Sequence, residues 1–138
     1  MGYLLDTNVV SEPIRSAPNP NVMRWLQEIS PELQHLSVLS IGELRHGLEM
    51  LPTGRRREKL RQLVEHDLPA WYGARLLPIT IEVAERWGRL AAQARRSLPR
   101  FESLIAATAL HHDLRLVTRN VSDFQSPGLE IVNPWEFE

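Results

Sequence analysis

Apolar residues occur along this chain in two arrangements: short runs, and longer segments in which they recur every three or four positions. The short runs predict strands at residues 3–5, 36–38, 76–79, 115–118 and 129–132. The helical spacing predicts helices at residues 22–29, 40–51, 57–70, 81–94 and 104–110. Because strands alternate with helices throughout, we expect βαβ units, a parallel sheet and helices on both of its faces, which is a layered α/β fold.

The size and composition of the chain narrow its class. With 138 residues, of which 43% are hydrophobic, it is long enough for one domain with a buried core, and we expect residues 1–138 to form that domain. No apolar run approaches the roughly 18 residues of a membrane span, and the N-terminal segment lacks the basic residues of a secretory signal. The absence of cysteine excludes a disulfide scaffold and fits a cytoplasmic location.

The net charge of the chain excludes binding of nucleic acid through a basic surface that covers the whole protein. Sixteen Lys and Arg residues face 17 Asp and Glu residues, so any nucleic-acid site has to be local. One local candidate is the basic cluster formed by Arg55, Arg56, Arg57, Lys59 and Arg61. These residues could contact a phosphate backbone, but a solvated helix face is the favoured interpretation.

Two of the four aspartates follow predicted strands directly. Asp6 comes after the strand at 3–5, and Asp123 lies shortly after the strand at 115–118. If these strands are neighbours in a parallel sheet, both carboxylates lie at the same edge, where α/β folds place their sites. Each aspartate alone is equally well explained as a turn residue, as are Thr7 and Asn8 after Asp6.

Two glutamates precede apolar helical stripes. Glu43 follows Ser40 by three positions, which favours a capping box, although a first-turn carboxylate can also face the crevice of the sheet. Glu102 opens the nearly all-apolar helix at 104–110. Glu102 is explained either by its favourable interaction with the helix dipole, or by a site in which its carboxylate, next to an apolar helix, is paired with polar groups or a cation.

Together these four acids predict a metal site. Several carboxylates that converge on one crevice repel one another unless a divalent cation neutralises them. Oxygen ligands suit Mg²⁺ or Mn²⁺. The five histidines show no zinc-binding spacing, and there is no cysteine, so zinc is not indicated.

Four ordered segments of the chain resemble the signature segments of PIN domains, above all those of VapC/FitB-type toxins of bacterial toxin–antitoxin pairs. The segments are LLDTNVVSE at 4–12, SIGEL at 40–44, SLIAATA at 103–109 and LVTRNVSDF at 116–124. The resemblance implies a three-layer α/β/α sandwich around a short parallel sheet. It also implies a metal-dependent endoribonuclease that hydrolyses RNA with a metal-activated water, a cognate antitoxin, and a homodimer or a larger toxin–antitoxin assembly.

The resemblance also assigns residues to the site. The catalytic and metal-binding positions of the family fall on Asp6, Glu43, Glu102 and Asp123. The supporting polar positions fall on Asn8, Thr118 and Asn120. Apart from the resemblance, our own hypothesis is that Arg119, Arg55, Arg56 and Arg57 contact RNA.

One departure keeps a second hypothesis open. The third acid of the family is usually aspartate, and Glu102 reaches one methylene further. Mg²⁺ requires near-octahedral geometry, so the longer side chain either binds through water or weakens the site. The alternative is therefore a catalytically weak or silent PIN domain that acts as an antitoxin-binding module.

Overall fold

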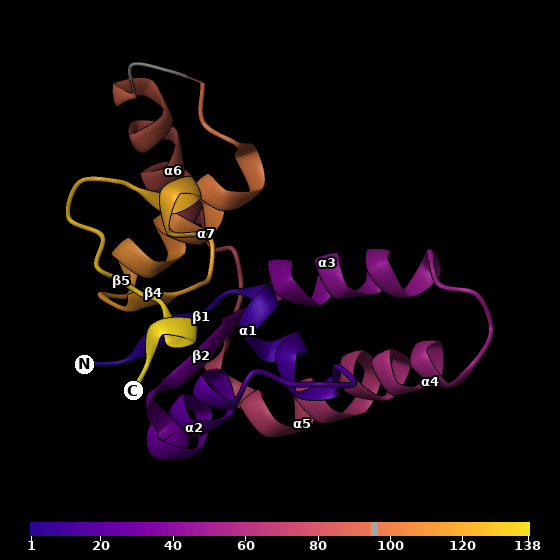
Figure 1. Ribbon diagram of the computed structural model, residues 1–138. Coiled ribbons are helices and arrows are strands. Elements are labelled where there is room, and N and C mark those ends of the chain that lie inside the picture. The colour runs from indigo at the N-terminus through magenta and orange to yellow at the C-terminus, as the bar shows by residue number, and fades with distance from the viewer. Residues whose placement is uncertain (95–96) are drawn as a thin grey trace.

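The fold was derived from a computed structural model that describes residues 1–94 and 97–138. Five parallel strands form one sheet in the order β3-β2-β1-β4-β5 (Figure 1). The strands are β1 (Tyr3–Leu5), β2 (Gln34–Ser37), β3 (Leu76–Leu77), β4 (Arg115–Val117) and β5 (Ile131–Val132). Each strand thus falls within or beside a predicted one, and the predicted α/β fold with a parallel sheet is confirmed. In the described part of the chain, no helix is long and apolar enough to cross a membrane.

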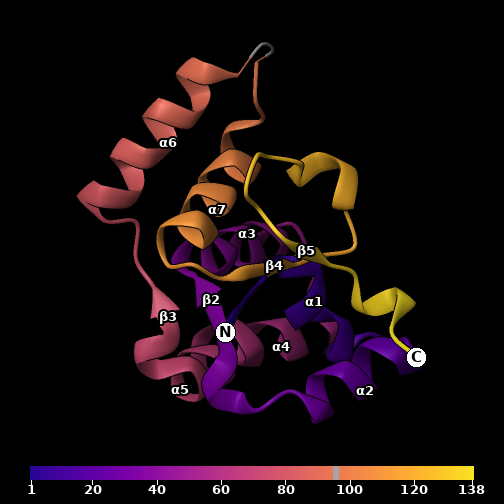
Figure 2. The ribbon, with the colours of Figure 1, turned by 90° about the vertical axis from the view of Figure 1, so that its left-hand side faces the viewer.

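Helices cover both faces of the sheet (Figure 2). The α-helices are α1 (Thr7–Ser11), α2 (Pro20–Glu28), α3 (Val38–Glu49), α4 (Arg55–Gln62), α5 (Leu68–Tyr72), α6 (Ile81–Gln93) and α7 (Arg100–His111). Short helical turns complete the structure, namely η1 (Glu12–Ile14), η2 (Pro31–Leu33), η3 (Leu63–Asp67), η4 (Gly73–Arg75), η5 (Val121–Phe124) and η6 (Pro134–Glu136). In Figure 2, α6 and α7 lie on one side of the sheet, and α2, α4 and α5 lie on the other.

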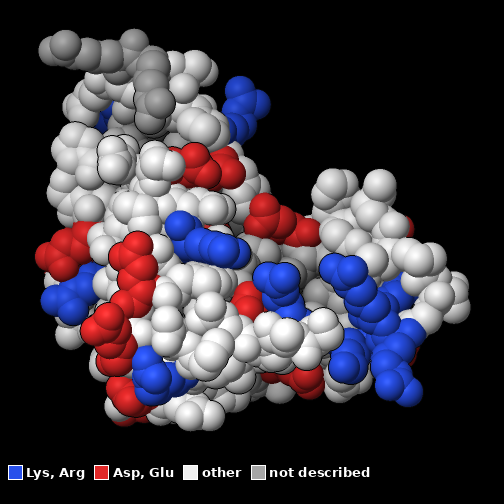
Figure 3. Space-filling view, in the orientation of Figure 1, with Lys and Arg blue, Asp and Glu red and all other residues white. Residues whose placement is uncertain are grey.

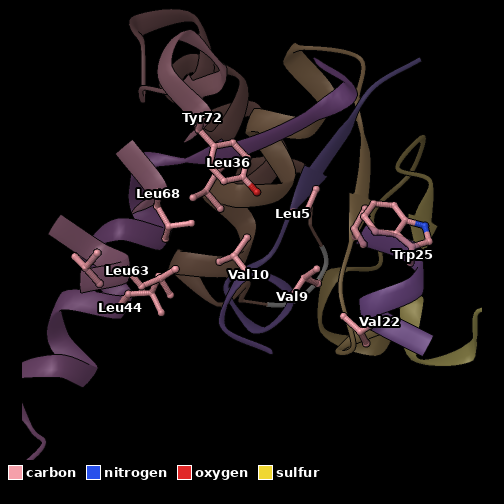
Figure 4. Packing of buried hydrophobic residues seen from close by; sticks show 12 residues of the cluster. Leu5, Val9, Val10, Val22, Trp25, Leu36, Leu44, Leu63, Leu68 and Tyr72 are labelled. Carbon is pink, nitrogen blue, oxygen red and sulfur yellow. The ribbon is translucent and has the colours of Figure 1, made fainter. Parts of the chain in front are cut away.

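The alternation of side chains along β1 creates two hydrophobic cores. Leu5 packs with Leu36 of β2 and Val117 of β4 in the larger core, which α1 to α5 cover (Figure 4). Leu4 points to the opposite face and packs with Ile105 of α7 and with residues of β4 and η5. Because successive strand residues face opposite sides, a three-residue strand serves both layers. This double burial explains why β1 reads as an unbroken apolar run rather than as an alternating one.

Several predicted boundaries differ from the structure, and two of the differences have a local physical reason. The strand expected at 36–38 ends at Ser37, whose side chain accepts a hydrogen bond from the backbone N–H of Leu39 and so caps α3. Val38 therefore begins a helix. The helical stretch that starts at Arg55 runs past Pro69 to Tyr72, because a π-helical turn leads into α5 and Pro69 occupies the first turn of that helix. Pro69 has no backbone N–H to donate, and the wider π-helical turn directly before it is where the hydrogen-bonding pattern of the helix changes.

Candidate active site

Asp6 lies at the carboxyl end of the central strand β1 and begins α1. Its Oδ1 accepts a 2.8 Å hydrogen bond from the backbone N–H of Thr7, which makes Asp6 the N-cap of that helix. Its Oδ2 accepts a 2.8 Å hydrogen bond from the hydroxyl of Thr118, which follows the neighbouring strand β4. Thr7 and Asn8 begin this helix, whereas the sequence was equally consistent with a turn there. Two bonds from neighbouring elements fix the direction of this carboxylate.

The environment of Asp6 opposes its ionisation. Only 6% of the residue is exposed. This burial raises the pKa of the Asp6 carboxyl above its usual range, although the hydrogen bonds from Thr118 and Thr7 act in the opposite direction. The negative charges of Glu43 and Glu102 raise the pKa further. These three carboxylates, which are far apart in sequence, are thus near enough to influence one another electrostatically.

Glu43 approaches Asp6 from α3. The predicted capping box is wrong, because Ser37 caps α3 and Ser40 lies inside its first turn. Ser40 is fully buried, and its Oγ accepts a 2.9 Å hydrogen bond from the hydroxyl of Thr7, which ties α3 to α1. Glu43, one turn further along, is exposed and is free of any capping role.

Glu102 reaches the same place from the first turn of α7. The next residue, Ser103, is buried, and its Oγ accepts a 2.8 Å hydrogen bond from the indole Nε1 of Trp87 on α6. The Ser103 hydroxyl in turn donates to the carbonyl of Arg100. These contacts hold the beginning of α7 against α6, and they therefore determine where the half-buried Glu102 lies.

The three carboxylates line one cavity of about 230 Å³ at the carboxyl edge of the sheet. Polar groups of α1 and of the segment after β4 contribute to its wall, and two phenylalanine rings complete the lining. The full lining consists of Asp6, Thr7, Asn8, Ser11, Glu43, Phe101, Glu102, Asn120 and Phe124. Acids from three separate segments therefore meet at the edge where parallel sheets form their sites.

The supporting residues Asn8, Thr118 and Asn120 connect to Asp6. The Thr118 hydroxyl oxygen accepts a 3.0 Å hydrogen bond from the backbone N–H of Asn120 while it donates to Asp6. The Nδ2 of Asn8 lies 3.5 Å from the same oxygen. In the described part of the chain, the Oδ1 of Asn8 is buried and has no hydrogen-bond partner. A buried acceptor without a donor costs free energy unless a ligand or water satisfies it.

The chemistry of this cavity fits a hard divalent cation. All its polar side chains offer oxygen donors, and the like charges that raise the pKa of Asp6 are those that a cation would offset. In the arrangement observed across residues 1–94 and 97–138, no three acidic or histidine side chains enclose a common point tightly enough to hold an ion. The carboxylates of Glu43 and Glu102 therefore face a shared cavity without forming a closed set of ligands.

Asp123 is the one predicted acid that the structure does not bring to this cavity. It lies in η5, is exposed, and does not line the cavity, although Asn120 and Phe124 on either side of it do.

The predicted basic residues have different environments. Arg57 is engaged within the fold, since its Nη1 donates to the carbonyl oxygens of Leu48 (2.8 Å) and Leu51 (2.7 Å) at the end of α3. Arg55 and Arg56 are exposed on α4. Arg119 is also exposed, and its guanidinium lies 5.3 Å from the ring centroid of Trp135.

Sequence reasoning missed several residues that shape the site. Ser11 lines the cavity one helical turn after Asn8, and Thr7 and Ser40 connect the two helices that carry Asp6 and Glu43. Reading Asp6 as an N-cap would have predicted α1 and placed these hydroxyls on it. By contrast, nothing in the sequence connects Trp87 with Ser103, because their contact depends on how α6 packs against α7.

Comparison with known proteins agrees with this arrangement. Residues 3–126 match the model of the PIN domain. The VapC ribonuclease Y4jK of Sinorhizobium fredii is 38% identical to this chain over 96% of it and 97% of the relative. Toxin FitB of Neisseria gonorrhoeae is 33% identical over 96% of this chain and 97% of that protein. A chain in the structure of FitAB bound to an IR36 DNA fragment superimposes with a TM-score of 0.87, at 32% identity over 99% of this chain and 97% of that one. The signature segments, the fold and these relatives together show that the chain belongs to the PIN domain family and is similar to its VapC and FitB toxins.

Proposed function

We propose that this protein is a metal-dependent endoribonuclease toxin that hydrolyses RNA phosphodiester bonds and is held in check by an antitoxin. The observation that carries the proposal is the cavity in which Asp6, Glu43 and Glu102 meet. Such a gathering of acids repels an RNA phosphate unless a cation lies between them. A named VapC ribonuclease that covers nearly the whole chain supports RNA as the substrate.

Asp6, Glu43 and Glu102 would hold Mg²⁺ or Mn²⁺, and Asp123, which lies outside the cavity, is not assigned to the ligand set. When bound, the cation would lower the pKa of a water molecule and stabilise negative charge on the transferred phosphate. Closing the ligand set requires Glu43 and Glu102 to turn towards Asp6. Both side chains are at least partly exposed and therefore have room to do so.

The protein's own residues prepare the site for this role. Thr7 and Thr118 hold both oxygens of Asp6, and their hydrogen bonds favour the ionised carboxylate that a cation needs. Asn8 and Asn120 supply amide groups at the wall. Arg119 follows Thr118 directly, and we assign it to the RNA phosphate backbone near the cleaved bond. Attack by water would leave 5′-phosphate and 3′-hydroxyl ends, in a reaction that we expect in the cytoplasm.

An antitoxin partner is part of the proposal. The FitAB structure, with its DNA fragment, and the FitB toxin itself indicate a toxin that works within a regulated pair. We propose the same for this chain, together with a homodimer that pairs into a larger assembly.

Cleavage of a labelled single-stranded RNA by the purified full-length protein tests the activity. We expect cleavage with Mg²⁺ or Mn²⁺, none after chelation, and none for Asp6→Asn. Asp113→Asn is a matched control because Asp113 is exposed and lies outside the cavity lining. Its φ of 55° is one that asparagine adopts readily.

The catalytically silent alternative has one supporting observation, which is that no closed set of ligands exists in the described residues. Glu102→Asp distinguishes the two functions. A wild-type protein that shows no metal-stimulated cleavage, while Glu102→Asp does, would identify a site silenced at this position. If neither protein cleaves RNA under any divalent cation, the nuclease assignment is wrong and the binding module remains.

A further inference from the structure

A second and larger cavity, of about 740 Å³, lies between η1 and α4. Pro13, Ile14 and Arg15 form one side of it, and Gly54, Arg55 and Lys59 belong to the other. Figure 3 shows Lys and Arg side chains gathered over the part of the molecule that contains α4, beside a hollow in the surface. We name this cavity the basic groove.

The cations of the basic groove are available to a ligand. Neither Arg55 nor Lys59 forms an ion pair with any residue in the described part of the chain. Arg15 lies 3.5 Å from the carboxylate of Glu12, and its side chain remains 63% exposed.

The two acids that line the basic groove, Glu58 and Asp67, have different partners. Glu58 forms an ion pair and hydrogen bonds with Arg61, and Asp67 accepts a hydrogen bond from Gln62. Gln62 is neutral, so Asp67 keeps its negative charge. Arg15, Arg55 and Lys59 outnumber it and leave the lining with an excess of positive charge, which suits a negatively charged ligand. None of the residues that line it is aromatic, so bases have no ring on which to stack.

The basic groove and the acidic cavity are lined in part by one short segment of the chain. Ser11 lines the acidic cavity and Pro13 lines the groove, and two residues of chain span at most about 7 Å. Buried Glu12 lies between them. It accepts a 2.8 Å hydrogen bond from the backbone N–H of Asn19 and so fixes the segment that carries Arg15. A single strand that followed this segment from the acidic cavity would bring its neighbouring phosphates towards the groove.

We propose that the basic groove binds the phosphates of single-stranded RNA next to the cleaved bond, an inference that rests on the proposed ribonuclease function. Arg15, Arg55 and Lys59 make the contacts, and the groove recognises the backbone independently of sequence. Arg57 takes no part, because its guanidinium is bound to the end of α3.

Binding of a fluorescent oligouridylate to the full-length protein carrying Asp6→Asn, which prevents cleavage, tests the groove. The measured quantity is the slope of log K, the logarithm of the binding constant, against the logarithm of the salt concentration. For single-stranded nucleic acid, each phosphate that a protein neutralises makes this slope steeper by about 0.7. We expect Arg55→Gln and Lys59→Gln each to reduce this slope by about that amount, and the double variant to reduce it by about twice as much. Arg89→Gln, an exposed arginine of α6 outside both cavities, is the matched control and should leave the slope unchanged.

Three results would overturn the proposal. One is an unchanged slope for the groove variants. Another is an equal reduction of the slope for Arg56→Gln. Arg56 is on α4 but does not line the groove, so this result would show that RNA responds to the overall charge of α4 rather than to the groove. The third is that the groove variants weaken binding to an acidic peptide such as oligoglutamate with RNA binding intact, which would make the groove a protein site. Metal-dependent cleavage by the wild-type protein is measured separately, so the nuclease proposal and the groove proposal can fail independently.

Discussion

Replacing Arg57 with alanine removes two short hydrogen bonds from the end of α3, and its effect can be worked out from the structure. The Leu48 carbonyl keeps a 3.1 Å bond from the backbone N–H of Leu51, whereas the Leu51 carbonyl loses the 2.7 Å bond from Arg57. A hydrogen bond from a charged donor contributes about 1.5–3 kcal/mol, so the bond to Leu51 dominates the effect. The accompanying ion pair with Glu49, at 3.6 Å and 58% exposed on the glutamate side, contributes little.

We therefore expect Arg57→Ala to lower the free energy of unfolding by about 2 kcal/mol. At roughly 4 °C per kcal/mol for a chain of this size, Tm falls by about 8 °C. Thermal and urea unfolding measure this, with Arg56→Ala as the control, because that exposed side chain should change stability by less than about 0.5 kcal/mol. If Arg57→Ala unfolds like the wild type but binds RNA more weakly, the structural role is wrong and the sequence-based prediction of an RNA contact is right.

Three further predictions concern the acidic cavity. Because burial raises the pKa of Asp6, its ionisation destabilises the folded state above that pKa, and the cost disappears as pH falls towards about 4. Asp6→Asn should therefore resist urea better than the wild type at pH 7 in chelator, with a difference that shrinks at lower pH, and it should lose any stabilisation by Mg²⁺. Thr118→Val removes the hydrogen bond that lowers the pKa of Asp6, so the acidic limb of the pH–rate profile for RNA cleavage should move to higher pH; an unmoved limb would separate Thr118 from the titration of Asp6. Trp87→Phe removes the 2.8 Å bond to Ser103, which should cost about 1 kcal/mol of stability and lower kcat with KM unchanged, and equal kcat would show that this bond does not position Glu102.

The architecture was predictable because each strand and helix leaves a local pattern in the sequence. Leu4 and Leu5 form an apolar run buried on both faces of a central strand, and the LIAATAL segment is apolar all round because α7 packs against both the sheet and α6. The acids at strand and helix ends were equally visible, because a charged residue directly after an apolar run is conspicuous. The exact ends of the elements were harder to predict. Ser37 and Ser40 are both suitable N-cap residues for α3, and only the conformation of the backbone shows that Ser37 is the cap.

The sequence by itself determined the fold class, the position of Asp6 at the end of a strand, and the likeness to PIN domains. These features depend on local patterns of residues and on ordered motifs. The tertiary structure alone decided which charges share a space. It placed Glu43 and Glu102 beside Asp6, left Asp123 outside the cavity, and turned Arg57 towards the end of α3 while Arg55 and Lys59 line the basic groove. The reason is physical: charge and hydrogen bonding act over a few ångströms in space, and residues as distant along the chain as Asp6 and Glu102 meet only when the sheet brings their segments together.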